Sequence, residues 1–353
     1  TAGVHLRELP LRLTKPLGTF WDPCTKTGKA PAKNELVKFQ GGAVHLGRSI
    51  NDPTYGWDCD YADESYTIDV PAFSASEFLV SHKEFYEFML DGGYQTKKWW
   101  DDEGWNWVQY TKTTHPWFWV PNKDGKTYRF RCMVSEIDIP WDWPVEVNNL
   151  EAKAYANWKG SKTGKKLRLP TEAEWKHMYD TCVNVELTEW KKAPGNINME
   201  HFRSSCPVNM FKQGKLYDVV GNVWCHTETP VYPYPGYRVH PLYDDFSMPT
   251  FDGRHTCQKG GAWISTGNEA TRDARFAFRR HFFQFIGIRL VEGGPVNEAK
   301  YLRNVLGLDP EVDQGADFCY GKTLDGQSNF SERLAAVAVA TFNKYKGPKV
   351  KLT

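Results

Sequence analysis

The sequence predicts an α+β fold with little regular secondary structure, in which large aromatic side chains hold ordered loops together. Aromatic residues make up 15% of the 353 residues, and 15 of the aromatic residues are Trp. The chain also contains 29 Gly and 21 Pro, which interrupt long helices and strands. Short runs with helical spacing are interspersed with short runs of β-branched residues, so both helices and strands are expected.

Composition divides the chain into three expected parts. Residues 1–36 mix Pro, Lys and Thr and are expected to form an N-terminal connecting arm. The main domain is expected over residues 37–295, because Gly293-Gly294-Pro295 breaks any regular element. Residues 296–353 differ in composition and are expected to form a C-terminal extension.

Strands are predicted where residues alternate between apolar and polar and β-branched side chains are frequent. The first two are Val37–Gly47 and Tyr66–Phe73. Two further short strands are expected near Gly260–Trp263 and Gly287–Val291, within a stretch where Gly, Pro and aromatic residues recur every few positions.

Helices are predicted where apolar residues recur at helical spacing after a capping residue. Ser81 and Glu84 have the spacing of a capping box, and Thr171 precedes acidic residues that favour a first helical turn. The predicted helices are Lys83–Asp91, Val147–Gly160, Glu172–Asp180 and, in the C-terminal extension, Ser331–Tyr345.

The charge balance disfavours a nucleic-acid-binding protein. The 44 basic and 43 acidic residues give a net charge of +1, so no long-range field attracts nucleic acid or an anionic membrane. No apolar stretch approaches the roughly 18 residues of a transmembrane helix. We therefore expect a soluble chain without a transmembrane segment.

The cysteine pattern favours a reducing compartment. Eight Cys are scattered along the chain without a CxxC pair or a dense framework, unlike a zinc ribbon or a disulfide-rich secreted domain. We expect reduced thiols in the cytoplasm or in an organelle matrix such as that of the mitochondrion, and not a secreted protein.

Four phrases occur in order over about 120 residues. They are Arg168–Trp175 (RLPTEAEW), Gly221–Trp224 (GNVW), Gly260–Trp263 (GGAW) and Gly287–Arg289 (GIR). With these phrases the chain resembles the sulfatase-modifying-factor, or formylglycine-generating-enzyme-like, family. The resemblance implies a C-type-lectin-like α+β fold with little regular secondary structure.

Longer segments resemble, more narrowly, the middle domain of the 5-histidylcysteine sulfoxide synthases, which are the ovothiol-forming enzymes. The segments are Tyr55–Asp58, Trp141–Asn148, Ser204–Val208, His240–Phe246, Pro249–Asp252, Ser265–Ala270 and Phe278–Gln284. These enzymes combine an iron-binding DinB-like domain, this middle domain and a methyltransferase, and they join the cysteine sulfur to the histidine ring with oxygen.

The departures from that pattern are as informative as the matches. The His-x3-His-x-Glu motif that supplies three iron ligands in the family does not occur in the sequence. Cys225 and His226 replace a Gln or Glu and a Trp after the GNVW phrase, and Phe285-Ile286 replace a His-Ala pair. By this resemblance residues 296–353 are a remnant of the methyltransferase lead-in, and both flanking catalytic parts are missing.

Two functions follow from the resemblance and its departures. The first is a degenerate, non-catalytic homologue of the sulfoxide-synthase middle domain that acts as a structural or binding subunit with other protein subunits. The alternative is the central portion of an active iron- and oxygen-dependent synthase, with non-haem iron held by the absent motif. A third is a lectin-like module with a calcium-dependent ligand site.

The resemblance also suggests individual site residues. Tyr243 would be a relic of an active-site tyrosine that donates a proton or an electron. Arg279, Arg280, Asp244 and Asp245 would be relics of substrate binding, since a guanidinium suits a carboxylate. The alternatives are a buried tyrosine that packs in an aromatic loop and a structural salt bridge for the arginines.

Other clusters favour structural roles. Adjacent side chains on a strand point to opposite faces, so Cys225 and His226 are not expected to cooperate as a nucleophile and base or as metal ligands. No metal site is predicted in this chain, although calcium is possible at acidic loop residues. Those residues are Asp58, Asp60, Asp63, Glu64, Asp244 and Asp245. The stripe from Trp99 to Trp119 is expected to pack in the core.

Overall fold

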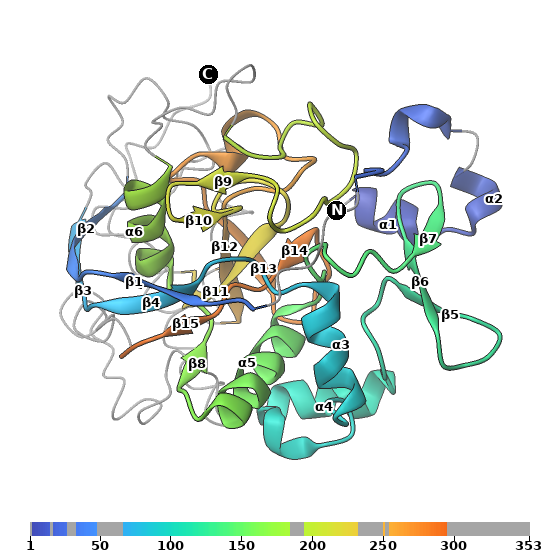
Figure 1. The fold of residues 1–353 in the computed structure, drawn as a ribbon, viewed down its shortest axis with the longest axis horizontal. Coiled ribbons are helices and arrows are strands. Elements are labelled where there is room, and N and C mark those ends of the chain that lie inside the picture. The colour runs from blue at the N-terminus through green and yellow to red at the C-terminus, as the bar shows by residue number, and fades with distance from the viewer. Residues whose placement is uncertain are drawn as a thin grey trace, which may run out of the picture.

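The computed structural model describes residues 2–14, 17–26, 33–47, 66–183, 194–231, 250 and 254–294 (Figure 1). Helices and strands are short and are mixed along the chain, which confirms the α+β class. In chain order they are α1 (Ala2–Glu8), α2 (Leu11–Thr14), η2 (Thr19–Trp21), β1 (Leu36–Phe39), β2 (Gly42–Leu46), β3 (Tyr66–Val70), β4 (Phe73–Ser76), α3 (His82–Leu90), η4 (Lys97–Trp99), α4 (Asp102–Thr111), β5 (Trp119–Pro121), β6 (Tyr128–Arg131), β7 (Glu136–Asp138), α5 (Asn149–Thr163), β8 (Leu167–Arg168), α6 (Glu172–Cys182), β9 (Lys212–Gln213), β10 (Leu216–Tyr217), β11 (Trp224–Pro230), β12 (His255–Lys259), η6 (Gly267–Ala270), β13 (Phe276–Arg279), β14 (Ile286–Gly287) and β15 (Val291–Glu292).

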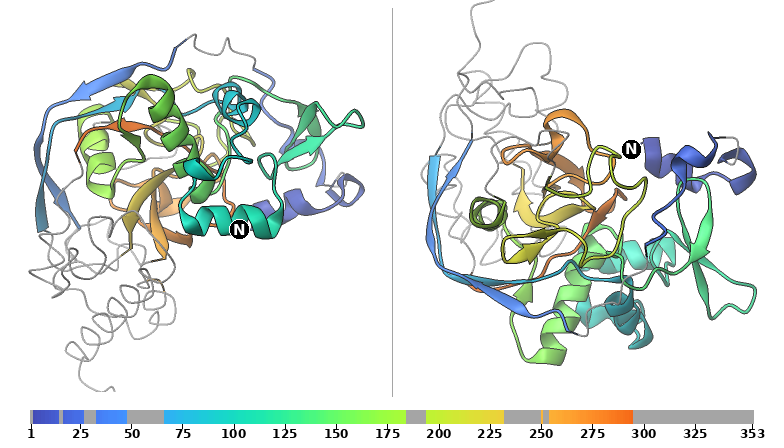
Figure 2. Two further views of the ribbon diagram at one scale, coloured as in Figure 1. Left: turned by 90° about the horizontal axis from the view of Figure 1, so that it is seen from below. Right: turned by 45° about the horizontal axis from the view of Figure 1, so that its top comes forward.

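A central sheet organises the fold. Its strand order is β13-β12-β11-β14, with β14 parallel to β11 and the other pairs antiparallel. A second sheet, β1-β4-β15-β8, joins the start of the domain to its end. Helix α6 lies between the β2–β3 ribbon and the central sheet and contacts both, as Figure 2 shows. The central sheet is therefore covered on one face by α6.

Each of the two strands predicted near the start of the domain is broken into two. Val37–Gly47 becomes β1 and β2, and Tyr66–Phe73 becomes β3 and the start of β4. The break is tight because the Cα of Gly41 lies against the other strand: a Cβ there would be 2.8 Å from the Val70 carbonyl oxygen. Pro71 follows Val70 and interrupts the partner strand.

The three helices predicted within the main domain are present, and each has a complete capping box. Ser81 and Glu84 cap α3, and Thr171 and Glu174 cap α6. Helix α5 begins after Asn148, two residues later than predicted, because the Asn148 side chain accepts from the Glu151 amide and caps it there. It ends at Thr163, three residues beyond the predicted end, and Gly164 caps it in the left-handed conformation. The helix predicted over Ser331–Tyr345 lies outside the described residues.

Two short strands were placed wrongly by the sequence. Residues 260–263 are not a strand: β12 ends at Lys259, and Gly260 and Gly261 have φ of 94° and 72°. The run Gly287–Val291 is not continuous either, because Arg289 lies between β14 and β15. Its guanidinium is buried and donates to the carbonyl oxygens of Ser76 and Tyr217, while the carbonyl oxygens of Ile288 and Leu290 accept from the Val80 and Ser76 amides.

The tryptophan stripe between residues 99 and 119 is largely core, as predicted, and it includes a helix that the sequence did not predict. Trp99, Trp100 and Trp119 are buried, whereas 46% of Trp117 is exposed. Helix α4 runs through the stripe because the Asp101 side chain accepts from the Gly104 amide and caps its first turn.

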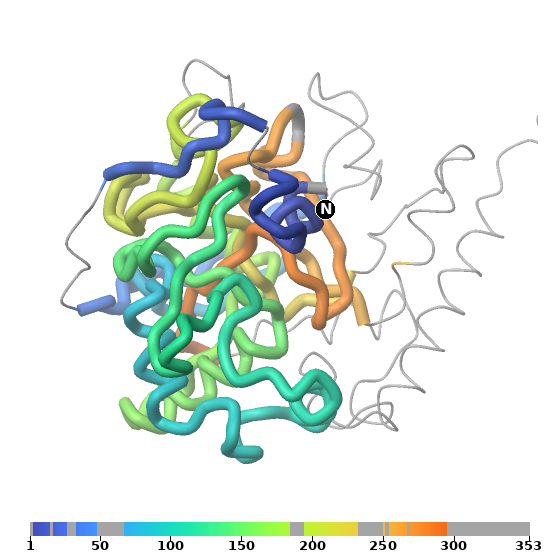
Figure 3. The backbone as a smooth tube through the Cα atoms, turned by 90° about the vertical axis from the view of Figure 1, so that its right-hand side faces the viewer, coloured from blue at the N-terminus to red at the C-terminus, as the bar shows by residue number. Residues whose placement is uncertain are grey.

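The N-terminal helices pack on the body of the domain beside β5–β7 (Figures 1 and 3). Arg7 of α1 is buried, forms an ion pair with Glu146 and donates from Nε to the Arg131 carbonyl oxygen at 2.8 Å. Its guanidinium carbon lies 3.6 Å from the centre of the Phe118 ring. None of the helices in the described ranges has the length and apolar character of a membrane span.

Candidate functional site

The structure separates the two arginines that the sequence proposed for substrate binding. Arg279 ends β13 and is exposed, whereas Arg280 is buried. Tyr243, Asp244 and Asp245 lie outside the described residues, as do the acidic residues Asp58, Asp60, Asp63 and Glu64. Their predicted roles therefore stay predictions.

Arg280 connects three elements. Its Nη1 donates to Glu103 Oε2 of α4 at 2.7 Å, and its carbonyl oxygen accepts from the Asn149 amide of α5 at 3.0 Å. The Asn148 side chain reaches the next carbonyl oxygen, that of His281, at 3.5 Å. The amino end of α5 is thereby held against the turn that follows β13, beside the central sheet.

Directly after the GNVW phrase, Cys225 and His226 point to opposite faces of β11. Cys225 belongs to the core cluster that includes Cys257 and Ala277, on the α6 side. Burial raises the pKa of Cys225 to about 11, so the residue is a neutral thiol. As predicted, the two side chains do not form a nucleophile–base pair.

His226 is fixed as a neutral hydrogen-bond acceptor. Its Nε2 lies 2.9 Å from the carbonyl oxygen of Val147. Because a carbonyl oxygen can only accept, Nε2 carries the proton and Nδ1 presents a lone pair. Burial lowers the pKa of His226 to about 4, which keeps the ring uncharged at neutral pH. Nδ1 is buried and has no hydrogen-bond partner.

Three neighbours of His226 also carry buried polar atoms without partners. Gln258 is its cross-strand partner on β12, and Thr256 lies two residues along β12 on the same face. The Asn149 amide group donates to the Thr227 carbonyl oxygen at 3.2 Å, which leaves its Oδ1 free. Each of the four side chains is at most 2% exposed. We call Asn149, His226, Thr256 and Gln258 the acceptor cluster.

Aromatic rings adjoin the acceptor cluster. Phe276 and Phe278 of β13 are the cross-strand partners of Gln258 and Thr256, respectively, and therefore lie on the same face of the sheet. The Trp224 ring lies 5.0 Å from that of Phe276. This face thus combines unpaired acceptors with apolar surface.

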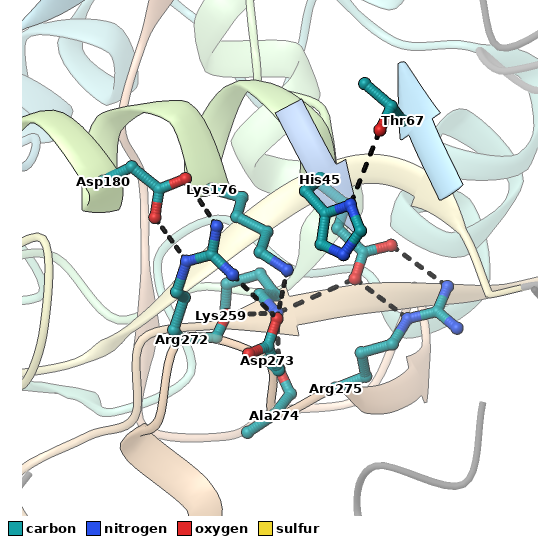
Figure 4. Close-up of polar contacts among 10 residues, drawn as sticks. His45, Thr67, Lys176, Asp180, Lys259, Arg272, Asp273, Ala274 and Arg275 are labelled. Carbon is teal, nitrogen blue, oxygen red and sulfur yellow. Dashed lines mark hydrogen bonds and ion pairs between the residues drawn. The ribbon is translucent and has the colours of Figure 1, made fainter. Parts of the chain in front are cut away.

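The opposite face of the same sheet has a different polar chemistry. Glu172 of α6 pairs with Arg275 at 2.9 Å and with Lys259 at 3.7 Å, and all three side chains are 1% exposed. Lys259 also donates to the Ala274 carbonyl oxygen at 2.6 Å. Lys176 pairs with Asp273 beside them, as Figure 4 shows. On this α6 side each of these charged groups has a partner.

No reactive thiol lies in the described part of the chain. Its six cysteines are free and buried: Cys24, Cys132, Cys182, Cys206, Cys225 and Cys257. Burial raises the pKa of every one of them, to about 12 for Cys132 and Cys257. These residues also contain no group of three His, Cys, Asp or Glu side chains that could hold a metal ion. The described residues therefore do not fit the three-ligand iron site of the sulfoxide synthases.

Sequence reasoning found His226 only as a departure from the family signature and did not find its partners. Asn149 is far in sequence from Thr256 and Gln258, which are neighbours on β12, and none of the three belongs to a recognisable motif. The substitution of His for the second Trp of the signature was the one signal available.

The family is decided by the match of residues 24–293 to the sulfatase-modifying factor enzyme 1-like domain. The chain belongs to this family. It is 30% identical over 308 residues to the hercynine oxygenase of Mycolicibacterium thermoresistibile, covering 81% of this chain and 64% of that protein. The hercynine oxygenase of Mycobacterium tuberculosis is 32% identical over 242 residues, covering 64% of this chain and 54% of that protein. The chain thus spans less than two thirds of these relatives.

A solved structure of PvdO from Pseudomonas aeruginosa is also similar. It covers 77% of this chain and 99% of its own, with a TM-score of 0.48 and 16% sequence identity. The match to the family model confirms the sequence-based resemblance and the fold expected from it. The two relatives described above are both named hercynine oxygenases.

Proposed function

We propose that this domain is a binding or structural subunit of the sulfoxide-synthase lineage and does not itself carry out oxidative C–S bond formation. The observation that carries the proposal concerns the two residues after the GNVW phrase. The Cys225 thiol and the His226 imidazole are both neutral and face opposite sides of β11, and His226 belongs to the buried acceptor cluster. Such a cluster suits recognition of a hydrogen-bond donor.

The thiols disfavour formylglycine-generating chemistry. A cysteine reacts or binds copper as the thiolate, and burial keeps the described cysteines protonated. Hence they are better suited to packing than to redox chemistry.

Exposed apolar side chains support protein partners. Leu9 and Leu13 of the N-terminal segment are 41% and 54% exposed. Trp117 is 46% exposed and its indole donates to Glu8 of α1 at 3.2 Å, so it lies beside that segment. Large exposed apolar groups, Trp above all, are typical of partner surfaces. We propose a larger assembly in a reducing compartment, consistent with the free cysteines.

The second candidate is the central portion of an active synthase. The 30% identity to a hercynine oxygenase favours it, and so does the buried Arg280, whose guanidinium would hold a substrate carboxylate on release from Glu103. In that case iron would be held by residues other than those described. Calcium at the acidic loops belongs to the third candidate, a lectin-like module.

The direct experiment is an activity assay. The purified chain is incubated aerobically with Fe(II), histidine and either cysteine or γ-glutamylcysteine, and sulfoxide products are sought by mass spectrometry. We expect no product above a chain-free control. A product that requires both the chain and iron would overturn the proposal, as would isolation of the natural protein as a longer chain that contains a His-x3-His-x-Glu motif and makes the sulfoxide.

A further inference from the structure

The acceptor cluster is unusual because its polar atoms are buried without compensation. His226 Nδ1, Asn149 Oδ1, Gln258 Oε1 and Thr256 Oγ1 all lack partners, whereas the great majority of buried polar side-chain atoms in proteins are paired. Each unpaired atom costs about 1–3 kcal/mol relative to a paired one. Three of them lie on one face of the sheet and the fourth, from Asn149, lies at the start of α5 beside it, so a common partner accounts for them more simply than four separate defects.

The partner must donate hydrogen bonds. Two of the acceptors cannot reverse their roles: the Val147 carbonyl oxygen fixes the proton on His226 Nε2, and the Thr227 carbonyl oxygen fixes the Asn149 amide nitrogen. Lone pairs from an imidazole and from amide oxygens repel a carboxylate or a phosphate. A group with several N–H bonds satisfies several of these atoms at once.

The surroundings favour a positive charge on that donor. Glu228 lies two residues from His226 on β11; its Oε1 accepts from the Leu169 amide at 3.2 Å, while its Oε2 is buried and unpartnered. The nearby cations are already engaged, Lys153 with Asp101 and Arg168 with Glu174. Glu228 is the one residue of β11 with a carboxyl group, and one oxygen of that group has no hydrogen-bond partner.

The aromatic neighbours indicate the rest of the ligand. Phe276 and Phe278 lie on the same face as the acceptors, and aromatic faces attract cations and pack against short alkyl groups. A metal ion fits less well, since the described residues contain no group of three His, Cys, Asp or Glu side chains.

We propose that the acceptor cluster binds the primary ammonium group of a small organic ligand whose short apolar body packs against Phe276 and Phe278. This inference rests on the proposed function in one respect only, namely that the domain binds a ligand. It places the recognition of the ammonium group at the acceptor cluster, a location that the family resemblance does not supply.

The test uses three probes of equal size: n-butylammonium, 1-butanol and butyrate. The full chain is labelled with ¹⁵N-histidine, and the His226 Nδ1 resonance is assigned by its loss in His226→Phe. We expect n-butylammonium to shift this resonance upfield in a saturable way, because the lone pair accepts a hydrogen bond. Butyrate should leave it unchanged, and 1-butanol should bind at least about tenfold more weakly, because it lacks the charge.

Two variants test the other members of the site. Glu228→Gln removes the charge and Gln258→Leu removes an acceptor; each should weaken n-butylammonium binding by about tenfold or more. Glu200→Gln, at an exposed site, is the matched control and should bind as the wild type does. Because the resonance is followed in the wild-type chain, the test holds even where a variant does not fold.

The outcomes are separable from those of the activity assay. If no probe shifts the resonance, or if all three shift it equally, the cluster holds water or nothing selective and the inference is overturned. A charge-selective shift supports it whether or not a sulfoxide product forms. Sulfoxide formation without any ammonium-dependent shift would overturn both proposals.

Discussion

The two faces of the central sheet use polar residues in opposite ways. On the α6 side, Glu172, Lys259 and Arg275 are fully buried but mutually paired. On the opposite face, beside the start of α5, His226 and Gln258 are equally buried, and each has an atom without a partner. These residues are equally buried, so the difference between the two sets is whether their polar side-chain atoms have partners.

That difference separates a structural role from a binding role. A paired buried ion contributes little net stability, but removal of one partner strands the other, so the network holds α6 to the sheet in one arrangement. An unpaired acceptor stabilises nothing in the free protein. Such an atom contributes favourable free energy only when it accepts a hydrogen bond from a bound donor, as expected of a binding site.

The largest effect is expected on the α6 side. Glu172→Gln leaves Lys259 and Arg275 buried with one anion fewer, and we expect the free energy of unfolding to fall by about 3–5 kcal/mol. Asp180→Asn is the control, because its pair with Arg272 is partly exposed and contributes less than about 1 kcal/mol. Urea unfolding followed by Trp fluorescence measures both. Equal effects would show that the buried network is no more important than a surface pair.

The second prediction concerns pH and His226. The pKa of this residue falls from 6.5 to about 4 on burial, so the unfolded state binds the proton first as the pH drops. The folded chain therefore loses up to roughly 3 kcal/mol between pH 6.5 and pH 4 through this group. His226→Phe should flatten that part of the stability profile. An unchanged acid limb in His226→Phe would contradict the neutral, buried imidazole.

Glu228 provides a control, because burial shifts its pKa in the opposite direction and its effect on stability changes with pH in the opposite sense. Burial raises the pKa of Glu228 from 4.5 to about 7, so its contribution is present below pH 4.5 and is lost as the pH rises through 7. This loss falls between pH 4.5 and 7 and so opposes the His226 effect over almost the same range. Glu228→Gln should therefore make stability fall more steeply as the pH drops from 6.5 to 4. The same urea titrations at several pH values measure both variants.

The helix caps should not distinguish the two sides. Thr171 caps α6 and Asn148 caps α5, each through a capping box. Replacement of either residue by Ala should lower the free energy of unfolding by about 1 kcal/mol, since one amide loses its acceptor. Calorimetric melting of the two variants measures this, and a difference of several kcal/mol between them would mean that the sides differ in more than side-chain pairing.

The smallest effect is also the most diagnostic. Thr256→Val removes an unpartnered hydroxyl at constant shape, so stability should stay within about 1 kcal/mol of the wild type or rise. Thr229→Val, on the other face, deprives the Glu172 amide of its acceptor and should cost about 1–2 kcal/mol. If Thr256→Val proves the more damaging of the two, its hydroxyl has a partner and the comparison of the faces fails.

Much of the fold was predictable because its signals are local. The caps of α3 and α6 were visible as Ser81 with Glu84 and as Thr171, since a capping box depends on residues three apart. The strand at residues 260–263 was wrong because the φ values of Gly260 and Gly261 follow from close packing: a Cβ on Gly260 would lie 2.6 Å from the Val219 carbonyl oxygen. The domain boundaries at residues 36 and 295 stay predictions.

The sequence by itself determined the family, the α+β class and the opposed directions of Cys225 and His226, since signature phrases and strand alternation are properties of the chain. Only the tertiary structure decided that Arg280 pairs with Glu103, and that His226, Asn149 and Gln258 meet with unpaired atoms. The reason is physical. Whether a polar atom finds a partner depends on residues distant in sequence, and only packing brings them within hydrogen-bond reach.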